Sequence, residues 1–132
     1  MKEFVTFEIA KKLKEKGFIH DYNLYGYKPI YTDVNTIALI WDIGAYEKDY
    51  FGENIPCPSI SQVLKWLREL LEIDILPKIT ISWCGNLNRI RLYSCNIYSP
   101  RLNKPIETEY FETYEECVLA GIEYVLDNFD KL

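Results

Sequence analysis

The chain has 132 residues and a formal net charge of −5 at neutral pH. Because nucleic-acid binders depend on Lys and Arg to neutralise phosphates, this charge argues against general nucleic-acid binding. No apolar run reaches about 18 residues, so the sequence predicts no membrane-spanning helix. The first residues lack the apolar core of a signal peptide, which favours a cytoplasmic location, and the length predicts a single domain.

The first predicted element is a helix over residues 7–16, with Thr6 as its N-cap. Gly17 is expected to take the left-handed position that follows the helix. Phe18 can then fold back on Leu13, as a Schellman motif requires.

A tyrosine-rich passage follows at residues 19–33. Tyr25 and Tyr27 alternate like a short strand, and Pro29 favours the edge of a sheet because proline lacks an amide donor. His20 is the chain's only histidine, and no catalytic partner for it can be argued from sequence order alone.

Residues 36–42 form a nearly continuous apolar run that contains Trp41, which predicts a central strand. The polar, aromatic residues 43–54 then predict an irregular loop. Tyr46 and Tyr50 in this loop are candidates for recognition, because loops carry binding residues more often than cores do.

The middle of the chain, residues 55–75, contains the clearest predicted helix, with apolar residues at a helical period. Ser59 and Gln62 have the spacing of a capping box, and Pro77 is expected to prevent any continuation. Trp66 lies beside the apolar stripe, where it either covers the core or forms one wall of a binding groove.

Residues 78–84 and 89–97 predict two strands joined by a turn. The alternation places Ile79, Ile81 and Trp83 on a half-buried, inward face.

In the second of these strands, Arg89 and Arg91 are expected to point outward, either into solvent or towards an anionic ligand. The apolar phase slips near Tyr93, which predicts a β-bulge.

Residues 108–111 predict a last short strand, and Thr113 with Glu116 predicts a second capping box that starts the final helix. Gly121 lies inside this helix, where glycine costs about 1 kcal/mol relative to alanine. Close approach of a neighbouring element would explain its presence.

Chemistry-bearing residues are sparse. Asp42, Glu47 and Asp49 allow a metal or acid–base cluster to be considered, and Cys57 precedes a predicted helix, where a thiol pKa can fall. Neither has an evident base partner, so we expect no catalytic site, no metal site and no cofactor. The cysteines form no CxxC pair and are expected to be free thiols: Cys57, Cys84, Cys95 and Cys117.

Together these elements predict the α+β class: one domain with a mainly antiparallel sheet and about three helices packed on it, in the order α-β-β-α-β-β-(β)-α. Three passages, at residues 5–18, 55–69 and 111–126, carry a helix ending in KGF, a proline-led helix with Trp and Arg-Glu, and a Tyr-Glu-Glu helix. In this order they resemble a group of small uncharacterised proteins of gut Bacteroidetes and their bacteriophages and mobile elements. The resemblance implies a cytosolic bacterial or phage origin and transfers no site.

The sequence favours a non-enzymatic binding protein, in the form of a phage or mobile-element accessory factor that engages a host protein through a Tyr-rich, acidic surface. One alternative is a protein that binds or sequesters a small anionic or aromatic ligand such as a nucleotide, through stacking and arginine contacts. An enzyme of unknown class is the third interpretation, and a homodimer stays open. The candidate binding residues are Tyr25, Tyr27, Trp41, Tyr46, Tyr50, Trp83, Arg89 and Arg91.

Overall fold

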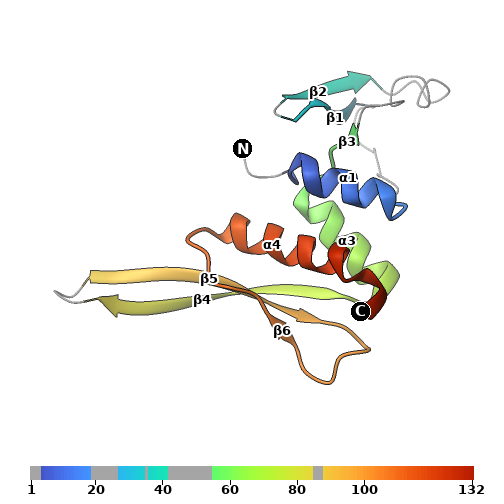
Figure 1. The fold of residues 1–132 in the computed structure, drawn as a ribbon. Helices are drawn as coiled ribbons and strands as arrows, with labels where there is room; N and C mark the ends of the chain where they lie inside the picture. The colour runs from blue at the N-terminus through green and yellow to red at the C-terminus, as the bar shows by residue number, and fades with distance from the viewer. Residues whose placement is uncertain (1–3, 19–26, 35, 42–54, 85–87) are drawn as a thin grey trace. The chain divides into compact units, whose positions relative to one another are not determined.

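The computed structural model describes residues 4–18, 27–34, 36–41, 55–84 and 88–132 (Figure 1). The three helices and the antiparallel strands of this part of the chain confirm the α+β class. Two details differ from the prediction: a two-residue strand at Ile55–Pro56 is added before the second helix, and the strands form two sheets. The residue contacts divide into two compact units, residues 1–63 and residues 64–132. The single domain expected from the length stays a prediction.

In the first unit, helix α1 spans Phe7–Glu15, and both of its predicted ends are confirmed. The Thr6 hydroxyl accepts a hydrogen bond from the Ile9 amide at 3.3 Å. Gly17 has φ +83°, and the Phe18 amide donates to the Leu13 carbonyl at 3.0 Å. This is the six-to-one hydrogen bond of a Schellman motif.

Three antiparallel strands form the sheet of the first unit, in the order β2-β1-β3. They are β1 (Tyr27–Asp33), β2 (Thr36–Trp41) and β3 (Ile55–Pro56).

This order corrects two predictions, because β1 is the middle strand and β2, predicted to be central, lies at the edge of the described sheet. The third strand pairs with β1 only at Ile30 and Tyr31. Pro29 lies just outside that pairing, so β3 requires no amide donor from it. For this reason β1 can contain Pro29 and still pair with a strand on each side.

The core of the first unit brings together the segment before α1, strand β1 and the segment before α3. The Tyr31 hydroxyl donates to the Val5 carbonyl, and the Val5 amide donates to the Pro58 carbonyl at 3.2 Å. Val5 and Cys57 are fully buried, and the Phe7 ring meets the Tyr31 ring edge-on at 5.5 Å. One tyrosine thus supplies both apolar area and a partner for a buried carbonyl.

Helix α3 spans Ile60–Leu71. Its predicted capping box is confirmed, since the Ser59 amide donates to Gln62 Oε1 at 2.9 Å and the Gln62 amide donates to Ser59 Oγ at 3.2 Å. The helix ends well before Pro77. Glu72 takes the left-handed conformation, with φ +56°. It therefore occupies the position after the helix where glycine is the usual residue.

The sheet of the second unit has the order β4-β5-β6. Its strands are β4 (Asp74–Cys84), β5 (Asn88–Tyr98) and β6 (Ile106–Glu107). The predicted short strand at 108–111 is displaced: β6 ends at Glu107, and Phe111 forms only an isolated bridge to Tyr93.

The pairing of β4 with β5 is regular from Asp74 opposite Tyr98 to Cys84 opposite Asn88. The predicted β-bulge near Tyr93 is therefore wrong. The apparent slip arises because both faces of the hairpin carry apolar residues, with Cys95 and Ile97 buried on one face and the exposed Ile90 on the other.

Helix α4 spans Tyr114–Asp127 and packs on β4 and β5. Thr113 is the predicted N-cap, accepting from the Glu116 amide at 3.2 Å. The other half of the predicted capping box differs, because Glu116 Oε1 accepts from the Thr113 hydroxyl at 3.0 Å and not from the Thr113 amide. The expected close approach at Gly121 is confirmed, because a Cβ there would lie 2.9 Å from Ile75 Cγ2.

The chain ends in a short 3-10 helix, η1, at Phe129–Lys131. The Trp66 ring stacks on the Phe129 ring, with centroids 6.3 Å apart, as expected if Trp66 covers the core rather than forming a groove wall. The Ser99 hydroxyl donates to the Leu132 carbonyl at 2.6 Å. This bond fixes the last residue beside the end of β5.

Candidate functional site: an exposed face of the β4–β5 hairpin

The β4–β5 hairpin is longer than the helix that packs on it. Eleven residues per strand give a length of roughly 37 Å at the usual rise. The 14 residues of α4 give only about 21 Å. In Figure 1 the hairpin runs well past the beginning of α4, so α4 does not cover the part of the hairpin nearest Cys84 and Asn88.

Three cross-strand pairs define one face of this uncovered part. Ile79 lies opposite Tyr93, Ile81 opposite Arg91, and Trp83 opposite Arg89. Directly paired residues and alternate residues share a face of an antiparallel pair. We call the set Ile79, Ile81, Trp83, Arg89 and Arg91 the hairpin face.

The apolar side chains of the hairpin face are exposed rather than half-buried inward, which corrects the prediction. Trp83 exposes 67% of its surface, Ile79 55% and Ile81 48%. Further along the same face, Ile75 and Ile97 are buried, where α4 packs.

The alternation within β4 is as predicted, but the register places Arg89 and Arg91 on the same face as Ile81 and Trp83, not on the opposite one. Alternation also does not say how far a covering helix extends. The sequence did contain one signal for this: the apolar stripe of the last helix is too short to cover the full length of the two strands.

The hairpin face carries a positive charge on a negatively charged chain. Residues 79–83 and 88–92 contain two arginines and no acidic residue, whereas the whole chain has a net charge of −5. Within the described residues, no ion pair involves Arg89 or Arg91, although Lys78 on the same hairpin pairs with Glu107 at 3.2 Å. The two guanidinium groups are therefore available to carboxylates from outside.

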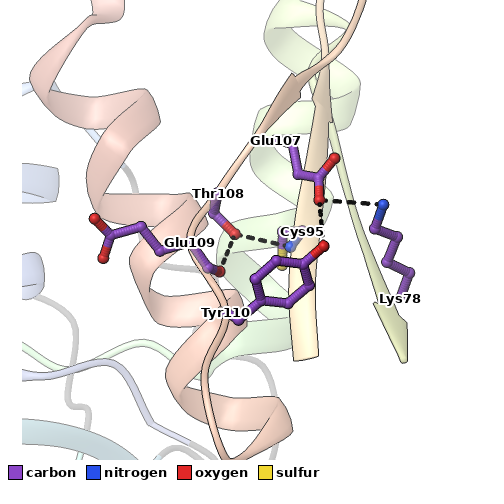
Figure 2. A network of polar contacts seen from close by, with 6 residues as sticks. All are labelled: Lys78, Cys95, Glu107, Thr108, Glu109 and Tyr110. Atoms are coloured by element: carbon purple, nitrogen blue, oxygen red, sulfur yellow. Dashed lines mark hydrogen bonds and ion pairs between the residues drawn. The ribbon is translucent and has the colours of Figure 1, made fainter. Parts of the chain in front are cut away.

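A polar network fixes β6 and the residues after it at the edge of the sheet (Figure 2). Glu107 accepts from the Tyr110 hydroxyl at 3.3 Å and pairs with Lys78. Thr108 Oγ1 accepts from the Cys95 amide at 2.8 Å and donates to the Glu109 carbonyl at 3.1 Å. These bonds attach the segment after β6 to β5. The polar residues of the network therefore have a structural role.

Three of the eight predicted binding residues, Trp83, Arg89 and Arg91, come together on the hairpin face. Tyr27 and Trp41 pair directly across β1 and β2, but their side chains lie outside the described part of the chain. Tyr25, Tyr46 and Tyr50 also lie outside the described residues. Ile79 and Ile81, assigned to the core from sequence, are the members of the face that sequence reasoning missed.

Cys57, the candidate nucleophile, has the wrong environment for that role. It is fully buried, and burial raises the pKa of its thiol to about 11. A reactive thiol needs a lowered pKa and access to solvent. The acids Asp42, Glu47 and Asp49 lie outside the described residues.

No group of three or more metal-ligating side chains occurs among the residues that the structure describes. Over the same ranges, no helix combines the length and the apolar character needed to cross a membrane.

No protein-family model, curated protein or solved structure matches this chain.

Proposed function

We propose that this chain is a non-enzymatic binding protein and that the hairpin face is the surface that contacts its partner. The observation that carries the proposal is the grouping of Trp83, Arg89 and Arg91 with two exposed isoleucines on one uncovered face. Tryptophan and arginine are the residue types most enriched among those that dominate binding energy at protein interfaces.

The chemistry of the face indicates the chemistry of the partner. Two arginines favour carboxylates, which they can bind through paired hydrogen bonds. The isoleucines and the indole favour an apolar surface between those carboxylates. We therefore infer a protein partner that presents acidic residues around an apolar centre. In the form that the sequence favours, this partner is a host protein met in the cytoplasm, and the chain is a phage or mobile-element accessory factor.

The exposure of the indole favours a macromolecule over an enclosed small ligand. Pockets for small molecules are concave and bury most of the ligand surface. Trp83 lies on a two-stranded surface with 67% of its area exposed. A flat partner surface covers such an indole more completely than a nucleotide-sized ligand would.

The test uses three immobilised proteins and nuclease-treated lysate from a gut Bacteroidetes strain. The first protein is the wild type, and the second carries Trp83→Ser, Arg89→Ser and Arg91→Ser. The third, a matched control, carries Ser82→Asp and Ile90→Ser on the opposite face of the same hairpin. Circular dichroism establishes that all three are folded.

The proposal expects a protein that binds the wild type and the control but not the hairpin-face variant. Equal retention of all captured proteins by the hairpin-face variant would overturn it. A parallel capture from untreated lysate serves as a comparison: binding seen there but lost after nuclease treatment would show a nucleic-acid partner and would also overturn the proposal.

A further inference from the structure

Two cysteines from different elements of the second unit meet in its core. Cys95 lies on β5 and Cys117 lies on α4, and both are fully buried. Their sulfur atoms are 2.7 Å apart. A disulfide bond has a sulfur–sulfur length of about 2.05 Å, so a shift of less than an ångström separates the contact from a covalent bond.

The close contact follows from how α4 is seated on the sheet. Gly121 lies one helical turn after Cys117 and therefore on the same side of the helix. A Cβ at Gly121 would lie 3.6 Å from Cys95 Cβ and closer still to Ile75. The missing side chain lets the helix backbone approach β5 and brings the two sulfurs together.

The strand side of the contact is also fixed. The Cys95 amide donates to Thr108 Oγ1 at 2.8 Å, and the Thr108 amide donates to the Cys95 carbonyl at 2.9 Å. Figure 2 shows Thr108 beside Cys95. Both cysteines are thus held by their backbones, and neither needs a rearrangement of the sheet or the helix to reach the other.

We propose that Cys95 and Cys117 are an intramolecular disulfide site, which links α4 covalently to β5 when the protein meets a small-molecule disulfide such as oxidised glutathione. One thiol, as its thiolate, attacks the small disulfide and releases one glutathione thiolate. The other protein thiolate attacks the mixed disulfide and releases the second. The protein loses two electrons and two protons, and one oxidised glutathione becomes two reduced molecules.

The burial of the two thiols makes this reaction slow in the closed protein. Burial raises the pKa of both Cys95 and Cys117, which suppresses the reactive thiolate. Oxidation therefore proceeds through local opening of α4 from the sheet. We expect its rate to rise several-fold in urea below the unfolding transition.

The link closes a loop of 22 residues. By loop-entropy reasoning it raises the melting temperature of the second unit by roughly 15 °C. The expectation of free thiols applies to the reduced protein, and the structure holds both cysteines in that state.

The test incubates the wild-type protein with oxidised glutathione in mild urea, blocks the remaining thiols by alkylation and digests with trypsin without reduction. Each cysteine falls in its own tryptic peptide: residues 49–65, 79–89, 92–101 and 102–131. We expect a disulfide-linked pair of residues 92–101 and 102–131, from protein that stays monomeric in a non-reducing gel. Alkylated thiols in both peptides, or links to either of the other two, would overturn the proposal.

A melting curve provides the second readout. Oxidation should raise the melting temperature of the wild type and of Cys57→Ala, whose substituted thiol lies in the other unit. It should leave Cys117→Ala unchanged. An equal rise in Cys117→Ala would contradict the link, and the peptide map needs no variant, so a poorly folded mutant does not affect it.

Discussion

Trp83 and Arg89 lie directly opposite each other across β4 and β5, on the same face of the hairpin. In a direct antiparallel pair the Cβ atoms are about 5 Å apart, so the indole and the guanidinium form one continuous patch. An aromatic ring and a cation side by side can bind an apolar group and a carboxylate of the same partner. This pairing is the smallest unit of the proposed binding surface.

If the hairpin face serves binding rather than folding, removing its indole should cost little stability. We expect Trp83→Ser to change the free energy of unfolding by no more than about 0.5 kcal/mol. Trp66→Ala, which removes the ring stacked on Phe129, should cost at least about 1 kcal/mol. Urea titration followed by circular dichroism compares the two, and a larger loss for Trp83→Ser would show that it belongs to a core.

The glycine in α4 gives a prediction with two opposing terms. Gly121→Ala should gain about 1 kcal/mol of helix propensity but lose about 1–3 kcal/mol from overpacking, because the new Cβ would lie 2.9 Å from Ile75 Cγ2. We expect a net loss of about 1 kcal/mol by urea titration.

The same substitution made together with Ile75→Ala should stabilise the protein relative to Ile75→Ala alone. This change from a loss to a gain in the free energy of unfolding is expected only if the new Cβ collides with the Ile75 side chain. A loss of equal size in both backgrounds would mean that Ile75 is not what Gly121 accommodates.

The cap of α4 can be tested by removing one hydroxyl. Thr113→Ala loses the acceptor for the Glu116 amide and the donor to Glu116 Oε1, and should cost about 1 kcal/mol. Thr113→Ser keeps the hydroxyl and should stay within a few tenths of wild type. Chemical denaturation of the wild type and the two variants measures these differences. Equal stability of Thr113→Ala and the wild type would mean that the cap does not stabilise the helix.

The buried thiol of Cys57 makes stability fall at alkaline pH. Above about pH 9 the unfolded chain has released this proton, whereas the folded chain keeps it up to a pKa of about 11. The unfolded state then binds fewer protons, so the free energy of unfolding decreases as the pH rises through this window.

The slope for this one group is at most about 1.4 kcal/mol per pH unit. Urea midpoints measured from pH 7 to 11 with a reductant should show the decrease. The Cys57→Ala protein should have a shallower slope, and identical slopes would remove Cys57 as a cause.

Local signals in the sequence predicted local structure well. The caps at Thr6, Ser59 and Thr113 and the turn at Gly17 depend on residues within one helical turn, and all four were confirmed. The end of α3 was not predictable in this way, because Glu72 takes the left-handed conformation, which glycine usually adopts at the end of a helix.

Features that depend on distant residues were less predictable. The place of β1 in its sheet is set by pairing with β3, which no pattern within β1 encodes. The exposure of Ile79 and Ile81 likewise depends on where α4 begins to cover the hairpin, so periodicity alone assigned them to the core. Arg89 and Arg91 are exposed as predicted, because charge is readable at a single position. Their face was predicted wrongly, since the register pairs them with Ile81 and Trp83 instead of placing them on the opposite side of the hairpin.

The most direct test of the binding surface is a selection of random peptides from a displayed library against the purified wild-type protein. We expect the selected peptides to combine Asp or Glu with apolar or aromatic residues. Their affinities, measured by calorimetry, should fall at least tenfold for Trp83→Ser and for the Arg89→Ser, Arg91→Ser double variant, and stay unchanged for the Ser82→Asp, Ile90→Ser control. Peptides without acidic residues, or affinities unchanged by the hairpin-face substitutions, would contradict the account.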